Sequence, residues 1–278
     1  MAARPQPGIV GGHGGCGAAG CVSGDALVAT IVVVGIGPGD PELLTLKGRT
    51  AIEDADYVAA FGTVLEPVSR WIRGAAMPMT YADQDQVLDQ LAAHARSGKQ
   101  CVVCAWGDLN FSAGELVARV RQRAEVELIP GVSSVQVACA RLGLAMEDSL
   151  FITLHVRDGH EAGLNDLIES LRSGERHLIV LPRPYDLMPR RIAEVLLDAG
   201  VSPDTSVHVL ERLSLPGERI AERSLASLAS DATECSDLTI LVFRSARRPA
   251  GREDRSSADH ARRHAPQAPR TLPPRLQR

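Results

Sequence analysis

Short apolar runs alternate with longer amphipathic segments through the middle of this chain, and this alternation is the feature that most limits its fold. The first series predicts strands at 31–35, 56–60, 101–106 and 125–129 and helices at 45–55, 84–97, 112–122 and 134–142. The second predicts strands at 151–154, 178–181, 207–210 and 238–243 and helices at 162–172 and 189–199. Such alternation is typical of βαβ units. We expect two α/β domains with mostly parallel sheets, residues 28–147 and 148–246, and a ligand cleft between them.

The composition is consistent with buried strands in a protein that has no membrane segment. Hydrophobic residues make up 45% of the chain but aromatic residues only 3%, so the core must consist mainly of Val, Leu, Ile and Ala. No apolar run approaches the roughly 20 residues that span a bilayer, and the N-terminus lacks the pattern of a secretory signal. We therefore expect a soluble, cytoplasmic protein that does not contact a membrane.

The two ends of the chain differ from the middle. Residues 1–27 are rich in Gly and Ala without periodicity, and residues 247–278 are rich in Arg and Pro without aromatic side chains. Neither segment can bury enough apolar surface to offset its ordering entropy, so we predict a disordered leader and a disordered basic tail. A basic tail can contact nucleic acid or an acidic partner. Without interleaved aromatic residues, a solvated extension is favoured and no nucleic-acid partner is expected.

The cysteines favour structural roles over metal binding. Cys101 and Cys104 have the spacing of a metal or redox motif, but they lie in a predicted strand whose alternating side chains point to opposite faces. A weak cluster of His13, Cys16 and Cys21 falls in the leader and is disfavoured by its composition. We therefore predict no metal site.

A glycine- and proline-rich turn, residues 35–41, follows the first predicted strand. A dinucleotide loop would need glycine where Asp40 stands, and Pro38 and Pro41 remove two main-chain donors. A phosphate loop would need a Gly-Lys-Ser/Thr sequence, which is missing. The remaining interpretations are an ordinary turn or one that offers oxygen atoms to a cationic or hydroxyl-bearing ligand.

Two further turns follow predicted strands of the same sheet. Residues 107–111 come after the strand at 101–106, and residues 130–134 come after the strand at 125–129. Open α/β sheets bind ligands at the carboxyl ends of their strands. The three turns together predict a shared ligand site.

Four ordered segments resemble the tetrapyrrole methylase family. They are VGIGPGDPELLTLK at 34–47, the Gly-Asp pair at 107–108, IPGVSS at 129–134 and ERLSLPGERI at 211–220. The resemblance spans residues 31–246 and implies a methyltransferase that uses S-adenosyl-L-methionine. Within the family, the segments at 133–136, 140–144 and 153–155 are most similar to enzymes that methylate C-5 of a corrin precursor in cobalamin synthesis. Other corrin methylases (C-11, C-17 or C-20), uroporphyrinogen methylases and a non-catalytic cofactor-binding subunit are the alternatives.

The resemblance also implies site residues. The expected cofactor contacts are Gly37, Pro38, Gly39, Asp40, Trp106, Gly107, Asp108, Phe111, Ser133, Ser134, Leu181, Pro182 and Leu213. Asp108 is also suited to cap a helix. The corrinoid substrate carries many carboxylates, for which arginines are natural partners; the candidates are Arg157, Arg183, Arg190 and Arg191. His155 is a candidate general base or carboxylate ligand, with a purely structural role as the alternative.

One of the departures from the family pattern lies in the second turn, and the resemblance also implies particular partners. Leu109 replaces the usual proline after Gly107-Asp108, which we expect to loosen that turn. Family members are typically homodimers, so we expect one here. Only about thirty residues follow the methylase region, so methylation and decarboxylation at C-15 would need a separate protein.

Overall fold

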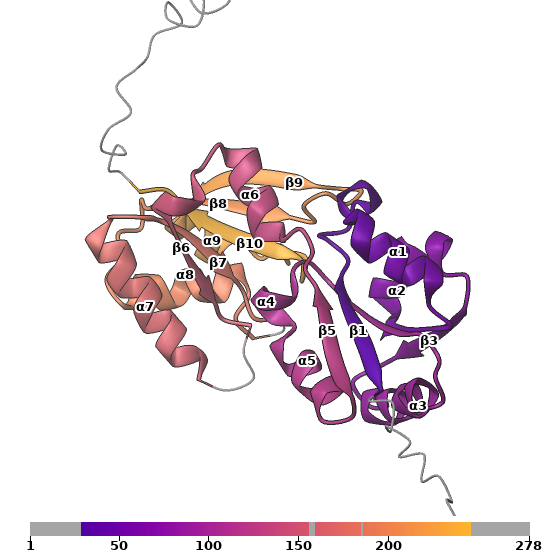
Figure 1. The fold of residues 1–278 in the computed structure, drawn as a ribbon. Helices are drawn as coiled ribbons and strands as arrows, with labels where there is room; N and C mark the ends of the chain where they lie inside the picture. The colour runs from indigo at the N-terminus through magenta and orange to yellow at the C-terminus, as the bar shows by residue number, and fades with distance from the viewer. Residues whose placement is uncertain (1–28, 156–158, 185, 246–278) are drawn as a thin grey trace, which may run out of the picture.

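The computed structural model describes residues 29–155, 159–184 and 186–245 of the 278-residue chain, arranged as two lobes that each contain a five-stranded sheet (Figure 1). The expected α/β fold is confirmed. The predicted leader and tail, the His13–Cys16–Cys21 cluster and Arg157 lie outside the described residues. Among the residues described, no helix is long and apolar enough to cross a membrane.

The first sheet is parallel throughout. Its strands in chain order are β1 (Thr30–Gly35), β2 (Tyr57–Phe61), β3 (Ala75–Met79), β4 (Cys101–Ala105) and β5 (Glu125–Ile129). In space the order is β3-β2-β4-β1-β5. Because β1 lies between β4 and β5 in parallel register, the carboxyl ends of these three strands meet at one edge.

Helices cover both faces of this sheet. They are α1 (Leu46–Asp54), α2 (Gly62–Val68), α3 (Gln84–Arg96), α4 (Leu109–Ser112) and α5 (Gly114–Arg121), with 3-10 turns η1 (Pro41–Leu43) and η2 (Ser69–Trp71). Cys101 packs on the face covered by α3 and α5, whereas Cys104 packs on the face covered by α1 and α2. Burial raises the pKa of the Cys101 thiol to about 11 and that of Cys104 to about 12. The prediction that these two cysteines point to opposite faces is confirmed.

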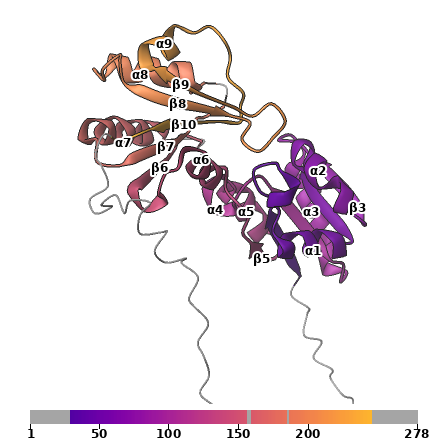
Figure 2. The same cartoon turned by 90° about the horizontal axis from the view of Figure 1, so that it is seen from above.

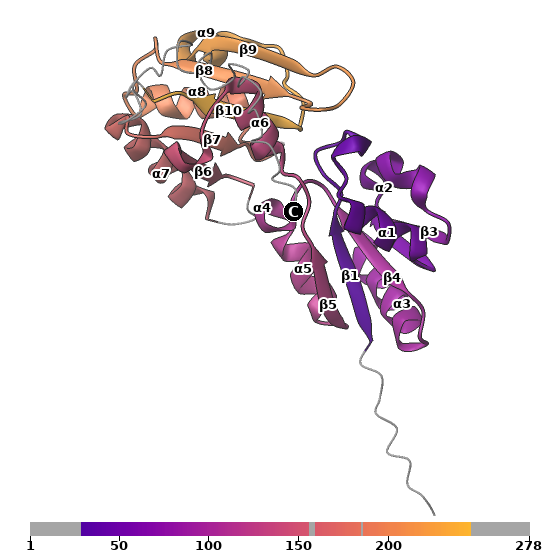
Figure 3. The same cartoon turned by 45° about the horizontal axis from the view of Figure 1, so that its top comes forward.

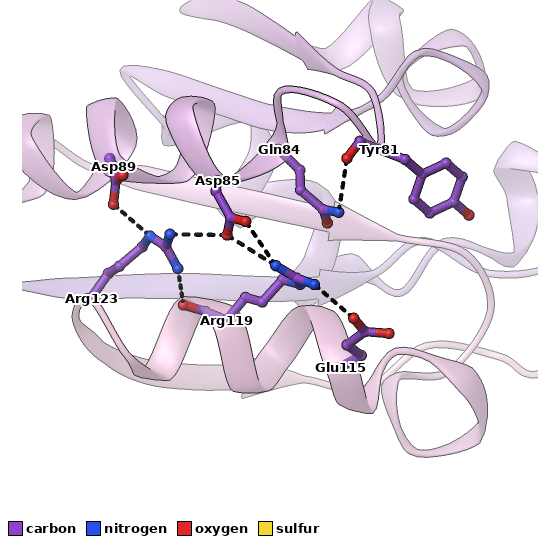
Figure 4. A network of polar contacts seen from close by, with 7 residues as sticks. All are labelled: Tyr81, Gln84, Asp85, Asp89, Glu115, Arg119 and Arg123. Atoms are coloured by element: carbon purple, nitrogen blue, oxygen red, sulfur yellow. Dashed lines mark hydrogen bonds and ion pairs between the residues drawn. The ribbon is translucent and has the colours of Figure 1, made fainter. Parts of the chain in front are cut away.

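Ion pairs join α3 to α5 (Figure 4). The Arg119 guanidinium contacts both oxygens of Asp85 at 2.9 and 3.1 Å, and Arg123 contacts Asp85 and Asp89 at 3.0 and 2.7 Å. The carboxylates are largely exposed, so each pair contributes little to stability. The network links α3 to α5 and to Arg123, which follows α5.

The second sheet is mixed. Its strands are β6 (Ser149–Thr153), β7 (His177–Leu181), β8 (Ser206–Glu211), β9 (Arg219–Ser224) and β10 (Thr239–Phe243), in the spatial order β6-β7-β10-β8-β9. Only β6 and β7 pair in parallel, whereas the β7–β10, β10–β8 and β8–β9 pairs are antiparallel. The expectation of a mostly parallel sheet is therefore wrong for this lobe. The reason is the β8–β9 hairpin, whose connection at 212–218 is too short for a parallel crossover.

Helices α7 (His160–Ser173), α8 (Pro189–Asp198) and α9 (Leu225–Ser230) pack on one face of the second sheet. The other face packs against α6 (Ser134–Leu142), which is followed by η3 (Met146–Asp148). Helix α6 buries Val135 and Ala138 against Ile179, Leu210 and Val242 of that sheet. Thus α6, placed in the first domain by the predicted boundary at 147, packs against the second sheet. It ends at Gly143, which adopts the left-handed conformation.

Figures 2 and 3 show the β8–β9 hairpin reaching from the second lobe toward the first, close to the turn that follows β1. Hydrogen bonds and packing described below join the two lobes at this point. The carboxyl ends of the first sheet's strands therefore face the β8–β9 hairpin of the second lobe.

Candidate active site

The turns after β1 and β4 are bound to each other through their main chains. Gly107 N–H donates to the Gly37 carbonyl at 2.8 Å, and Gly37 N–H donates to the Gly107 carbonyl at 3.3 Å. Ile36 N–H donates to the Ala105 carbonyl at 2.9 Å. Two residues expected to contact cofactor, Gly37 and Gly107, therefore also hold the turns together.

Glycine is required where the three turns meet. A Cβ on Gly35 would lie 2.6 Å from the Gly107 carbonyl oxygen, and one on Gly131 would lie 2.3 Å from that same oxygen and 2.5 Å from that of Gly35. These are main-chain atoms that cannot turn aside. The close approach explains why positions 35 and 131 are glycine, which the sequence shows but cannot explain.

Asp108 connects the second turn to the third. Its Oδ1 accepts hydrogen bonds from Asn110 N–H at 2.9 Å and from the Asn110 amide at 2.8 Å, so it caps α4 as the sequence suggested. Its Oδ2 accepts from Gly131 N–H at 3.1 Å. Leu109 is 4% exposed and packs in the core beside α3 and α5. The Leu109 side chain therefore anchors the turn in the core of the first lobe.

Ser133 and Ser134 begin α6 in the third turn. Ser133 is buried, and its hydroxyl accepts from Val135 N–H at 3.0 Å while its own N–H donates to Gln136 Oε1 at 2.7 Å. This reciprocal pair is a capping box. Asp40 caps the short helix η1 in the first turn in a similar way, accepting from Glu42 N–H at 2.9 Å.

Apolar residues expected to contact cofactor come together from both lobes. Phe111, from the first lobe, and Leu181 and Leu213, from the second, pack against the same buried cluster around α6. Phe111 also meets Phe151 of β6 edge to face, with ring centroids 5.8 Å apart. Pro38 and Pro182 are buried, and Trp106 packs on the face of the first sheet covered by α1 and α2.

The β8–β9 connection contains contacts that sequence reasoning missed. Ser214 Oγ accepts from Asp40 N–H at 3.2 Å, across 174 positions of the chain. The Leu215 side chain covers Gly39, where a Cβ would lie 2.3 Å from Leu215 Cδ2. No local pattern signals these contacts, because they depend on how the two lobes meet.

The candidate substrate residues are only partly brought together. His155, at the end of β6, is exposed, yet the atoms around it remove enough water to lower the pKa of its side chain, an effect reinforced by the positive charge of Arg183. Arg183 contacts His160 Nδ1 at 2.8 Å and Asp186 at 3.1 Å.

Arg190 and Arg191 lie on α8 and bind Glu194 at 3.1 and 3.0 Å. Their guanidinium groups are more than half exposed, so they remain accessible to a ligand. No cluster of three or more potential metal ligands occurs among the described residues.

Comparison with known proteins identifies the family. The family model for tetrapyrrole (corrin/porphyrin) methylases matches residues 30–229, which include all three turns and the β8–β9 connection. The chain belongs to this family. A probable cobalt-precorrin-7 C(5)-methyltransferase of Methanocaldococcus jannaschii is 31% identical over 215 residues, covering 77% of this chain and 97% of that protein.

Other tetrapyrrole methylases show similar agreement. An S-adenosyl-L-methionine-dependent uroporphyrinogen III methyltransferase of Methanosarcina barkeri is 31% identical over 227 residues, or 73% of this chain and 86% of that protein. The structure of uroporphyrin-III C-methyltransferase from Thermus thermophilus, complexed with S-adenosylhomocysteine, is 26% identical with a TM-score of 0.61 and covers 77% of this chain and 92% of that one. The tetrapyrrole methylases are S-adenosyl-L-methionine-dependent methyltransferases, and this chain is one of them.

Proposed function

We propose that this chain transfers a methyl group from S-adenosyl-L-methionine to C-5 of a corrin precursor, in the synthesis of cobalamin. The observation that carries the proposal is the 31% sequence identity to the archaeal protein named as a probable cobalt-precorrin-7 C(5)-methyltransferase. The match covers 97% of that protein. The residues at 153–155, at the end of β6, agree with it because they are the ones most similar to C-5 methylases. Relatives with other names, including a cobalt-precorrin-4 C(11)-methyltransferase at 27% identity, make the ring position the point to test.

The residues of the three turns suit S-adenosyl-L-methionine. The cofactor carries a positively charged sulfur whose methyl group is the one transferred, together with an amino group and a ribose diol. Asp40 and Asp108 are half-buried carboxylates held in fixed orientations by main-chain N–H groups. Oriented carboxylates favour cations and hydroxyl donors over phosphates. The apolar side chains of Phe111, Leu181 and Leu213 would exclude water from the reacting atoms.

These residues act mainly by positioning. Methyl transfer to carbon requires the two reacting atoms in line at about 3–3.5 Å. The first-lobe turns would hold the cofactor, and the second lobe would present the ring carbon to it. Because the turns are fixed by main-chain contacts, little of the binding free energy is lost in ordering them.

His155 is the residue we propose for proton removal from the ring. Its lowered pKa keeps the imidazole neutral near pH 7, which is the form that accepts a proton. Arg183 beside it, with the exposed Arg190 and Arg191, would bind the peripheral carboxylates of the substrate. We also propose that the enzyme acts as a cytoplasmic homodimer.

The decisive experiment incubates the purified chain with cobalt-precorrin or precorrin intermediates and ¹³C-methyl-labelled S-adenosyl-L-methionine. Mass spectrometry reports methyl addition, and NMR of the product reports the methylated carbon. We expect a single label at C-5. A label at C-11, C-17 or C-20, or turnover of uroporphyrinogen instead, would replace the C-5 assignment with another member of the family. Cofactor binding without turnover of any tetrapyrrole would indicate a non-catalytic subunit.

A further inference from the structure

We propose that Ser214 is a positioning residue that fixes the turn after β1 in the conformation that binds cofactor. This inference rests on the proposed function, because it assigns a task to a residue beside the proposed cofactor site. Ser214 lies in the β8–β9 connection, and its hydroxyl accepts the Asp40 N–H at 3.2 Å. The hydrogen bond reaches the main chain of the glycine turn, so it acts on the shape of the turn.

The backbone of this connection is held in a rare conformation. Arg212 (φ 51°) and Ser214 (φ 62°) are the only non-glycine residues with left-handed φ angles in the part of the chain that the structure describes. A serine rarely adopts this conformation, and residues that do so concentrate at binding and catalytic sites. The conformation aims the Ser214 hydroxyl at the Asp40 N–H. Glycine would suit the backbone angle better, but it has no hydroxyl to accept this hydrogen bond.

Two charged residues hold Ser214 in place. Ser214 N–H donates to Glu218 Oε2 at 2.7 Å, and the Arg141 guanidinium contacts both oxygens of Glu218 at 2.7 and 3.2 Å. Arg141 lowers the pKa of Glu218 through these hydrogen bonds, which keeps the carboxylate ionised. The acceptor of the Ser214 N–H therefore carries full charge at neutral pH.

This chain of contacts joins the first turn to the third through the second lobe. Arg141 lies in the last turn of α6, the helix that Ser133 caps at the third turn. The contacts run from α6 through Arg141 and Glu218 to Ser214, and from there to Asp40. The Leu215 side chain presses on Gly39 beside this hydrogen bond. These contacts link the glycine turn to α6 and to the β8–β9 hairpin.

The test measures binding of S-adenosylhomocysteine to the full chain by calorimetry, together with the melting temperature of each ligand-free variant. Ser214→Ala keeps the Cβ but removes the acceptor, whereas Ser214→Gly removes the acceptor and also relieves the backbone strain. Ser214→Asn supplies an amide oxygen on a residue that tolerates the left-handed conformation. Ser230→Ala removes an exposed hydroxyl on α9, away from Asp40, and serves as the matched control.

We expect Ser214→Ala and Ser214→Gly each to raise the Kd about three- to ten-fold, the effect of one hydrogen bond. Ser214→Gly should leave the ligand-free melting temperature unchanged or higher, and Ser214→Asn and Ser230→Ala should bind within about two-fold of the parent. In turnover assays, the KM for S-adenosyl-L-methionine should rise with Ser214→Ala while kcat at saturation is retained.

Parent-like binding by Ser214→Gly would overturn the inference and leave the proposed function intact. The inference would also be overturned if only Ser214→Ala bound the ligand more weakly and its melting temperature fell as well. That result would assign Ser214 a role in folding only. Failure of the unsubstituted chain to bind S-adenosylhomocysteine would instead overturn the proposed function.

Discussion

The two lobes contribute to the candidate site by different means. In the first lobe, the turns after β1, β4 and β5 meet through main-chain hydrogen bonds and glycine contacts. In the second lobe, the contribution consists of side chains, including the buried Leu213 and the Ser214 hydroxyl. The first lobe should therefore tolerate almost no added atoms at Gly35 and Gly131, whereas the second lobe should respond to removal of specific groups.

The largest effect should come from adding one methyl group to the first lobe. Gly131→Ala places a Cβ against main-chain atoms of both other turns, so we expect a loss of at least about 4 kcal/mol in the free energy of unfolding. Chemical denaturation measures it. Gly114→Ala is the control, since a Cβ there meets nothing within 4 Å at the start of α5, and its stability should be equal or higher. Normal stability of Gly131→Ala would show that the turns are not closely packed.

In the second lobe, truncation of a buried side chain should have the next largest effect. Leu213 is 4% exposed and packs against α6, so Leu213→Ala should lower the free energy of unfolding by about 3 kcal/mol. Leu46→Ala changes a leucine that is 82% exposed and should alter stability by less than about 0.5 kcal/mol. Equal effects of the two variants would mean that the β8–β9 connection does not pack on α6 in solution.

His155→Asn tests whether the second lobe also contributes to chemistry. We expect kcat to fall about 100-fold, within the range for a general base. Because the pKa of His155 is lowered, its neutral form persists below pH 6.5, and the parent rate should decline only as the pH falls through that lower value. The pH–rate profile of the variant should lack this acidic limb. An unchanged limb would contradict a role for His155 as base.

The smallest effect concerns a charge in the first lobe. Asp108→Asn keeps an oxygen that can accept from Asn110 N–H, but it removes the negative charge and replaces the oxygen that accepts from Gly131 N–H with an NH2 group, so we expect stability to fall by about 1–2 kcal/mol. Binding of cationic S-adenosyl-L-methionine should weaken more than binding of neutral S-adenosylhomocysteine, as measured by calorimetry. Equal affinities in parent and variant would indicate that Asp108 serves only as a helix cap and a link to Gly131.

The sequence predicted the elements whose side chains are buried. The β-branched run at 31–35 and the amphipathic segment at 84–97 correspond to β1 and α3 because burial imposes a recognisable pattern. Strand β9 was missed because its first four residues are exposed, and β3 because it is largely exposed and contains Pro78. Edge strands need no apolar pattern, so the edge strands β3 and β9 left no signal, whereas the edge strands β5 and β6 were predicted.

The candidate site was predictable only in part, for a related reason. The convergence of Gly37 and Gly107 follows from the parallel order of strands, which the alternation of elements implies. The contacts of Ser214 and Leu215 do not follow, because they depend on the antiparallel hairpin and on the way the lobes meet. Contacts within one sheet can be predicted from the order of the elements along the chain, whereas contacts between the two lobes cannot.

Hydrogen–deuterium exchange with and without S-adenosylhomocysteine tests the central claim most directly, namely that the turns of the first sheet and the β8–β9 connection together form the cofactor site. We predict that the ligand slows amide exchange in four separate segments, 35–41, 106–111, 130–134 and 212–218, with little change in α7 and α9. Protection confined to one turn, or located outside these segments although the ligand binds, would contradict the account.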